Sequence, residues 1–383
     1  MADFDETDLQ LTLTNQVNNL TVGPAPFEAI VREGGRIRRR RYATRAALTL
    51  GLAGAMVSGL ILVQSAAGRP SPTAPTGPGP AANVPAASTG PAGAGPTGGG
   101  GTGGGTGPTQ SPATKVDFRP AQDLSGVPND VLAATVKGRA SGVEGQVLVW
   151  LPPQYDDPAY RGRTFPVIEL LPGFPGSPSV WFGAMQASEQ LKGLITDHGS
   201  QPFILVAPQT SLSSTEDPGC VDVPGKVKAE TWLTQDVPQL VLDNFRADPA
   251  AERWSVAGYS AGAHCATRLG IGHPDRFHAV AGFSGFNDPA TEPTSAAAKD
   301  PELRKSASPL NMLRSAAQPP HVSLYEAAAA HDGLEDAKAL KAAATSPTTV
   351  TVVENTASHS IHSWRGMVSD ALRWLSQQTP EQR

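Results

Sequence analysis

A serine at the centre of a short glycine-flanked pattern is the residue of this chain best suited to nucleophilic chemistry. Residues 258–262 read Gly-Tyr-Ser-Ala-Gly, with Ser260 in the middle. In a G-x-S-x-G pattern, a sharp turn between a strand and a helix exposes the serine hydroxyl, and a Cβ at either glycine would collide with a neighbouring element. The N–H of Ala261 is expected to point to where an oxyanion would form. The pattern predicts a nucleophile, although 40 glycines in 383 residues also allow an ordinary glycine-rich loop.

A histidine in the last quarter of the chain has a context that suits a general base. His359 follows the β-branched run 348–353 and precedes residues 364–375, whose apolar residues recur with helical spacing. A loop after the last strand can bring an imidazole to a serine at the end of a sheet. His362 is an alternative base, but a polar residue at a helix start also explains it.

Carboxylates that could orient this histidine gather between the serine and the histidine, which is the order that the pattern requires. Asp332 lies between a predicted strand and a predicted helix over residues 334–344. Glu335 and Asp336 fall in the first turn of that helix, where the helix dipole favours acids. Asp332 is the preferred candidate, although a turn or N-cap role would also explain it. Glu326 is a weaker alternative.

The loop after an early strand is expected to supply a second oxyanion donor. The apolar run 165–171 predicts this strand, and Pro-Gly-Phe-Pro-Gly follows it. Prolines have no N–H to donate, so Phe174 is the natural donor after Gly173. A plain Pro/Gly turn is the alternative interpretation.

Strand and helix patterns alternate over residues 115–383, and this region has the length of one α/β domain. An antiparallel pair comes first and six further strands follow. The predicted strands lie at 131–136, 145–151, 165–171, 203–206 and 254–257, then at 278–283 and near Val322 and Val350. Helical patterns such as 232–241 separate them. The alternation predicts an α/β fold with a mostly parallel sheet covered by helices on both faces.

Taken together, these pieces resemble the esterase family of α/β-hydrolases that includes esterase D and the mycobacterial antigen 85 mycolyltransferases. Residues 170–174, Leu-Leu-Pro-Gly-Phe, are similar to the family's strand and oxyanion loop, and residues 258–262 match its nucleophile turn. His359, followed by Ser and, five residues after it, by Trp364, matches the family's histidine segment, which favours His359 over His362.

The resemblance covers about 270 residues and implies the α/β-hydrolase fold and acyl-ester chemistry. One position departs from the family pattern, because Pro172 stands where Asp or His is usual. The resemblance does not choose among Asp332, Glu335 and Asp336 for the acid, and it does not identify the substrate.

The chain has two cysteines, Cys220 and Cys265. If the domain lies outside the cytoplasm, a disulfide between them is chemically permitted. It would pin a loop near the predicted nucleophile, whereas two free buried thiols are the alternative. Neither cysteine has the spacing of a metal site, so no metal or other cofactor is expected.

A single membrane anchor is predicted near the N-terminus. Residues 46–68 are uncharged and mostly apolar, which is long enough to span a bilayer, and an arginine-rich run at 36–41 precedes them. Positive residues stay in the cytoplasm, so residues 1–45 are predicted to be a cytoplasmic tail and the catalytic domain to be extracellular. A cleaved signal peptide is the alternative.

Residues 69–114 are predicted to be a linker between this anchor and the α/β domain. From residue 70 to residue 114 the chain has no charged side chain and is rich in Pro, Gly, Ala, Ser and Thr. Such a composition cannot bury a core. The arginine run is better explained by membrane topology than by nucleic acid, so no nucleic-acid partner is expected.

These observations leave three classes of function. The favoured class is an extracytoplasmic serine esterase or acyltransferase that acts on an ester, including an acyl-lipid or acyl-glycan. The second is a catalytically inactive hydrolase-fold protein that binds the cell wall. The third is a serine peptidase, which uses the same three side chains.

Overall fold

The computed structural model describes residues 115–213 and 215–381. The predicted tail over residues 1–45, the predicted membrane helix over 46–68 and the predicted linker over 69–114 lie outside the described residues. Within the described ranges no helix combines the length and apolar character needed to cross a membrane.

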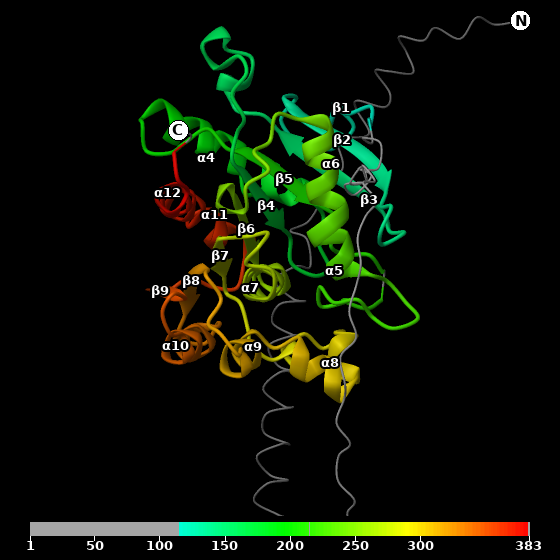
Figure 1. Ribbon diagram of the computed structural model, residues 1–383, viewed down its shortest axis with the longest axis vertical. Coiled ribbons are helices and arrows are strands. Elements are labelled where there is room, and N and C mark those ends of the chain that lie inside the picture. The colour runs from blue at the N-terminus through cyan, green and yellow to red at the C-terminus, as the bar shows by residue number, and fades with distance from the viewer. Residues whose placement is uncertain (1–114, 214, 382–383) are drawn as a thin grey trace, which may run out of the picture. The chain divides into compact units, whose positions relative to one another are not determined.

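A nine-stranded sheet forms the centre of the domain, with strand order β1-β2-β3-β5-β4-β6-β7-β8-β9 (Figure 1). The strands are β1 Arg119–Pro120, β2 Val131–Lys137, β3 Glu144–Trp150, β4 Val167–Leu171, β5 Ile204–Pro208, β6 Trp254–Tyr259, β7 Ala279–Phe283, β8 Ser323–Ala329 and β9 Thr349–Asn355. β1, β2 and β3 pair antiparallel, and β3 pairs antiparallel with β5. From β5 to β9 every pair is parallel. The predicted mostly parallel sheet is confirmed.

Helices connect the parallel strands. They are α3 Ser179–Phe182, α4 Ala187–Thr196, α5 Ala229–Thr231, α6 Val237–Asn244, α7 Ala261–Gly272, α8 Pro301–Ser306, α9 Pro309–Ser315, α10 Leu334–Ala343, α11 Ile361–Arg365 and α12 Val368–Gln378. A π-helical turn over Trp232–Asp236 joins α5 to α6.

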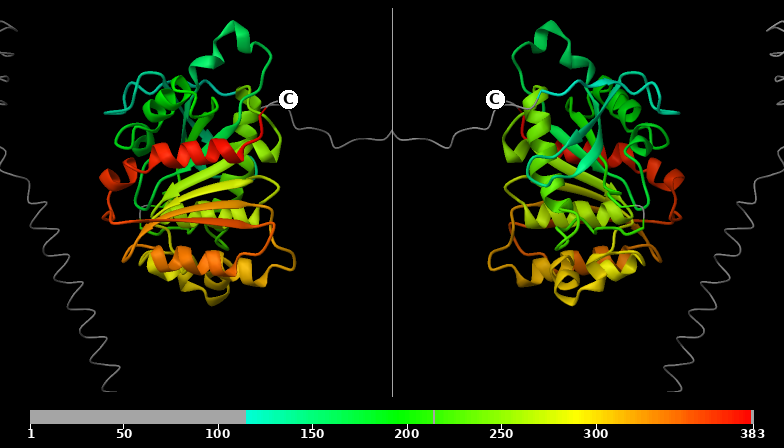
Figure 2. Two further views of the ribbon diagram at one scale, coloured as in Figure 1. Left: turned by 90° about the vertical axis from the view of Figure 1, so that its left-hand side faces the viewer. Right: turned by 90° about the vertical axis from the view of Figure 1, so that its right-hand side faces the viewer.

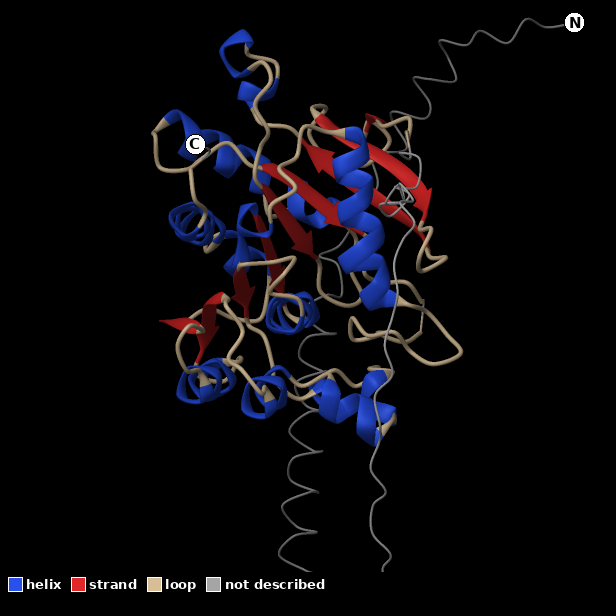
Figure 3. Ribbon diagram, viewed as in Figure 1, coloured by secondary structure: helices blue, strands red, loops and turns tan. Residues whose placement is uncertain are grey.

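Two hydrophobic layers cover the two faces of the sheet, because alternate strand residues point to opposite sides. Ile168 and Leu170 of β4 pack into the layer that α3, α4, α11 and α12 cover. Val167 and Leu171 of the same strand pack into the layer that α6, α7 and α10 cover. Figures 2 and 3 show α12 and α10 on opposite sides of the sheet. The central strands β4 to β7 are buried along their whole length, as expected for a parallel sheet with two covered faces.

The register of the parallel strands brings their carboxyl ends to one edge of the sheet. Leu171 of β4 lies beside Gly258 of β6, and Phe283 of β7 lies between Tyr259 and Ala327 of its neighbours. The loops after β4, β6, β7, β8 and β9 therefore leave the sheet at the same edge, which is where open α/β sheets place their ligand sites.

Three details differ from the sequence-based prediction. β1 was not predicted, because it has two exposed residues and contains Pro120 rather than an apolar run. The predicted helix over 364–375 is two helices, and the break falls at Gly366, which ends α11 and is a poor helix former. The predicted helix over 232–241 has a π-helical first half, because Pro238 cannot donate the backbone hydrogen bond of a regular α-helix.

Candidate active site

Ser260 occupies a strained turn between the end of β6 and the start of α7. Its backbone angles are φ 56° and ψ −124°, a combination that is rare for a residue with a side chain. A Cβ on Gly258 would lie 2.0 Å from the carbonyl oxygen of Gly262, and a Cβ on Gly262 would lie 2.2 Å from the carbonyl oxygen of Leu171. Both glycines are therefore required for the turn to fit between β4 and α7.

Backbone hydrogen bonds fix this turn against the neighbouring strand. The Ser260 N–H donates to the carbonyl oxygen of Phe283 at 2.9 Å, and the Ser260 carbonyl oxygen accepts from Ala263 and His264 of α7. Ala261 is the first residue of α7, so its N–H has no acceptor within the helix. This helix end also favours negative charge through its dipole.

His359 connects the serine to a carboxylate. Its Nε2 lies 3.0 Å from Ser260 Oγ, and its Nδ1 lies 2.6 Å from Asp332 Oδ1. The three residues come from three separate loops, after β6, after β8 and after β9. The His359 side chain is 49% exposed and that of Asp332 is 20% exposed, so solvent reaches the imidazole while the carboxylate is largely shielded.

The other acid candidates have different partners. Glu335 is exposed and forms an ion pair with Lys338. Asp336 accepts a hydrogen bond from the backbone N–H of Asn287, which ties α10 to the loop after β7. Glu326 is buried and accepts a hydrogen bond from Thr267 at 2.8 Å. Among the candidate acids, the structure therefore brings Asp332 to His359.

The alternative base lies elsewhere. His362 is an exposed residue in the last turn of α11, three residues beyond His359. The segment between them contains Ser360, whose hydroxyl accepts from the N–H of Ser363 and caps the helix.

Two carboxyl groups beside the site, one buried and one half-buried, have raised pKa values. Burial raises the pKa of Glu326 to about 7, and the nearby charge of Asp336 adds to this effect. Burial also raises the pKa of Asp336, despite its hydrogen bonds from Asn287. Glu326 and Asp336 line a cavity of about 10 Å³, which has room for about one water molecule.

Phe174, the predicted second oxyanion donor, is half-buried in the loop after β4. This loop lies directly against the serine turn, because a Cβ on Gly173 would be 3.2 Å from the Cβ of Ser260. Farther along, the N–H of Gly176 donates to Ser211 Oγ and holds the end of the loop. The loop therefore runs beside Ser260 and against the first turn of α7, where a Cβ on Gly262 would lie 2.6 Å from the carbonyl oxygen of Pro172.

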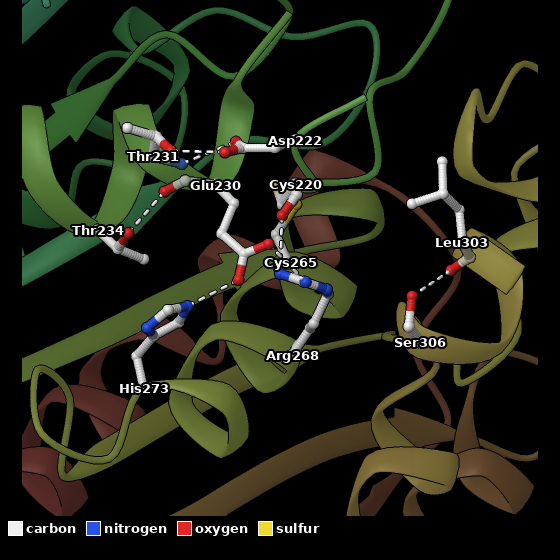
Figure 4. A network of polar contacts seen from close by, with 10 residues as sticks. All are labelled: Cys220, Asp222, Glu230, Thr231, Thr234, Cys265, Arg268, His273, Leu303 and Ser306. Carbon is white, nitrogen blue, oxygen red and sulfur yellow. Dashed lines mark hydrogen bonds and ion pairs between the residues drawn. A yellow bond between two sulfur atoms is a disulfide. The ribbon is translucent and has the colours of Figure 1, made fainter. Parts of the chain in front are cut away.

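A disulfide joins Cys220 to Cys265, with Cα atoms 5.5 Å apart. It attaches the loop between β5 and α5 to α7. Arg268 reinforces the attachment by donating to the Cys220 carbonyl oxygen at 2.8 Å and to Glu230 at 2.7 Å (Figure 4). Burial alone would raise the pKa of Glu230, but hydrogen bonds from His273 and Arg268 lower it to about 2.

Trp364, which belongs to the histidine motif of the sequence, contacts the histidine ring. The ring of Trp364 lies 4.6 Å from that of His359 at an interplanar angle of 85°, and its Nε1–H donates to Ser284 Oγ at 3.0 Å. Ser284 is not among the residues predicted from the sequence. Its position, directly after the predicted strand 278–283, was the available signal, since active sites lie at carboxyl ends of strands.

Among the residues that the structure describes, no group of three or more His, Cys, Asp or Glu side chains is arranged to hold a metal ion.

Comparison with known proteins gives a family for this chain. Residues 139–375 match the model of the Esterase family, described as "Putative esterase". An uncharacterised protein of Corynebacterium glutamicum is 30% identical over 183 residues, which are 47% of this chain and 41% of that protein. The chain spans less than half the length of the curated relatives that it matches.

Solved structures with the same fold include a ferulic acid esterase and an S-formylglutathione hydrolase. A ferulic acid esterase aligns with a TM-score of 0.56 and 20% identity, covering 65% of this chain and 98% of that one. S-formylglutathione hydrolase from Agrobacterium tumefaciens aligns with a TM-score of 0.54 and 17% identity, covering 65% and 95%. These two likenesses show an α/β-hydrolase-like fold, and the family model, which spans more than half of the residues, shows that the chain belongs to the Esterase family.

Proposed function

We propose that this chain is a serine esterase or acyltransferase whose nucleophile, base and acid are Ser260, His359 and Asp332. One observation carries the proposal. A continuous pair of hydrogen bonds runs from Asp332 Oδ1 through His359 to Ser260 Oγ, at 2.6 and 3.0 Å. The strained turn at Ser260 supports the same conclusion, because strain of this kind persists where the surrounding structure holds a reactive group in place.

The proposed reaction begins with proton transfer. His359 Nε2 takes the proton of Ser260 Oγ while the oxygen attacks the ester carbonyl carbon, and Asp332 stabilises the imidazolium that forms. The N–H groups of Ala261 and Phe174 donate to the oxyanion of the tetrahedral intermediate. His359 then gives its proton to the leaving alkoxide, which departs as an alcohol and leaves Ser260 acylated.

Deacylation repeats these steps with a new nucleophile. Water gives a carboxylic acid, and an acceptor alcohol gives a new ester, so the second reactant decides between hydrolysis and transfer. Because the His359 side chain is half-exposed, both water and an acceptor alcohol can reach it. The proposed substrate is a carboxylic ester, including an acyl-lipid or acyl-glycan.

The proposal also includes a location. The disulfide between Cys220 and Cys265 fits an oxidising compartment, and the arginine run before residues 46–68 fits an anchor with its N-terminus in the cytoplasm. Protease added to spheroplasts should release the catalytic domain. A fully protected domain would exclude this orientation.

Labelling with a fluorophosphonate, together with hydrolysis of p-nitrophenyl esters, tests the catalytic assignment. Wild type should be labelled, and Ser260→Ala should lose labelling and at least about 10⁴-fold in kcat/KM. Ser315→Ala, which removes an exposed hydroxyl at the end of α9, is the control and should match wild type. Failure of wild type to label would favour a catalytically inactive binding protein. Faster cleavage of peptide amides than of esters would favour a peptidase.

A further inference from the structure

Trp364 lies between the strand that carries the nucleophile and the loop that carries His359, and its contacts have no role in the proposed reaction so far. One contact of Trp364 is with Tyr259, the residue before Ser260, at a ring distance of 4.9 Å and an interplanar angle of 25°. Another is with His359, at 4.6 Å and 85°. Trp364 therefore touches both the residue that precedes the nucleophile and the base itself.

Burial differs sharply across this set of rings. Tyr259 is 3% exposed and Trp364 is 4% exposed, whereas the side chain of His359 is 49% exposed. Tyr259 also packs on Trp181 of α3, at 5.5 Å. The indole is therefore fixed in the core, and the imidazole rests against it at the surface. Since the backbone around His359 is a loop between β9 and α11, the fixed indole limits how far the imidazole can move.

A single hydrogen bond sets the rotation of this indole. Its Nε1–H donates to Ser284 Oγ at 3.0 Å, and the Ser284 side chain is buried. Ser284 itself has φ 54°, and its N–H donates to the carbonyl oxygen of Ala327 at 2.9 Å. The preceding residue, Phe283, accepts the N–H of Ser260. The end of β7 therefore holds the nucleophile through Phe283 and the indole through Ser284.

We propose that Trp364, held by Ser284, is a positioning residue that sets the reach of His359 to Ser260. The indole acts as a spacer of fixed thickness between β6 and the histidine loop. The role rests on the proposed function, because it requires that His359 be the base for Ser260. Small displacements matter in such a relay, since a misplacement of about 1 Å can cost about a hundredfold in rate.

Substitutions of the two partners test this role with kcat, KM and the rate of fluorophosphonate labelling. Ser284→Ala leaves the indole N–H buried without its acceptor, and we expect kcat and the labelling rate to fall about tenfold with KM within about twofold. Trp364→Phe keeps an aromatic spacer and should lose a similar factor. Trp364→Leu removes the ring and should lose about a hundredfold. The conservative variant thus rescues part of the loss.

The double variant separates positioning from general destabilisation. The double variant Ser284→Ala with Trp364→Phe removes acceptor and donor together. The loss in kcat and labelling rate should therefore stay at about tenfold rather than reach the product of the two single losses. Trp374→Phe is the matched control, because Trp374 lies on the neighbouring helix α12 and packs on Tyr325 instead. It should keep wild-type kcat and labelling.

A proton signal adds a readout that a purely structural role would not change. The proton between His359 Nδ1 and Asp332 should give a low-field NMR resonance in wild type, and Ser284→Ala should shift or broaden it while circular dichroism stays unchanged. The positioning role is wrong, and the nucleophile assignment stands, if the folded variants Ser284→Ala and Trp364→Leu are labelled as fast as wild type. If wild type is not labelled, the proposed function itself fails.

Discussion

Ser260 and His359 face each other across 3.0 Å, yet the protein holds them in opposite ways. The serine is fixed by its own backbone, in a strained turn between a buried strand and a helix whose residues are buried from Ala261 to Ile271. The histidine lies on a loop, half exposed, and is held by side chains: Asp332, Trp364 and the serine itself.

This difference separates two kinds of precision. A backbone turn enclosed by β4 and α7 has no freedom to adjust, because the carbonyl oxygens of Leu171 and Gly262 occupy the space that a larger residue would need. A loop held by side chains can adjust, and its accuracy depends on each contact. Changes in the serine turn should therefore damage stability and activity together, whereas changes at the partly exposed side chains of His359 and Asp332 should damage mainly activity.

The largest effect is expected at the histidine end. Asp332→Asn should leave the fold intact and lower kcat by about 10⁴-fold, because the amide favours the wrong imidazole tautomer and cannot stabilise the imidazolium. Steady-state ester hydrolysis measures this. Glu335→Gln and Asp336→Asn are the controls, since Glu335 pairs with Lys338 and Asp336 binds Asn287. A severe loss in either control with a mild loss in Asp332→Asn would move the acid into α10.

The next effect is expected at the serine end. Gly262→Ala places a Cβ 2.2 Å from the backbone oxygen of Leu171, so β4 or α7 must move, and we expect the free energy of unfolding to fall by at least about 4 kcal/mol. Activity should fall with it. Urea unfolding measures the change.

Gly193→Ala is the matched control for this prediction. Gly193 lies within α4, and a Cβ there would have no heavy atom within 4 Å. It should stabilise the protein by about 0.5–1 kcal/mol, because alanine favours a helix over glycine. Equal behaviour of the two variants would mean that the enclosure of Ser260 is loose.

The same contrast explains how much of the site could be predicted from the sequence. A backbone turn leaves a contiguous pattern, so residues 258–262 predict the turn and the helix that follows. Runs of apolar and β-branched residues likewise predict β2 to β9, because such runs mark strands by composition alone. Asp332 and His359 needed their context, and composition left Glu335, Asp336 and His362 open.

Contacts between side chains far apart in the chain left no pattern to find. Ser284 and Trp364 are 80 residues apart, and nothing in either segment indicates that a hydroxyl accepts from the indole. The partner of Glu326 was equally hidden, because Thr267 reaches this β8 side chain from helix α7, 59 residues earlier in the chain. Pairings of this kind follow from strand order and register, which depend on the whole fold.

The disulfide tests whether a loop far from the histidine supports the serine end. Cys220 and Cys265 are separated by 45 residues, and closing a loop of that length stabilises the folded state by about 3–4 kcal/mol. The double variant Cys220→Ser with Cys265→Ser should lose this stability and still fold, because Arg268 and Glu230 continue to hold the loop on α7. We expect kcat to change by less than about tenfold. A collapse of activity at unchanged Ser260 labelling would instead assign the loop to substrate binding.

The last effect concerns Glu326, a buried carboxyl group on β8 that faces α7. Burial raises its pKa to about 7, and it accepts from Thr267 of α7. A glutamate in the unfolded chain has a pKa of about 4.3. Between about pH 4.3 and 7 the folded protein therefore keeps a proton that the unfolded chain has lost. The folded state binds more protons in this window, so its stability falls as pH rises, and above about pH 7 the loss is constant.

Glu326→Gln removes this titration and keeps both the volume of the side chain and an acceptor for Thr267. The variant should match wild type near pH 4.3 and become more stable than wild type by up to about 4 kcal/mol above pH 7, because each pH unit of the window contributes about 1.4 kcal/mol. Urea unfolding at several pH values measures the difference. Glu335→Gln, at a side chain that is 80% exposed, is the control and should differ from wild type by less than about 0.5 kcal/mol at every pH. The prediction is wrong if the difference in unfolding free energy between Glu326→Gln and wild type stays constant from pH 4.3 to 8. Glu326 would then be ionised in the folded protein, and the hydrogen bond from Thr267 would have to stabilise its buried charge.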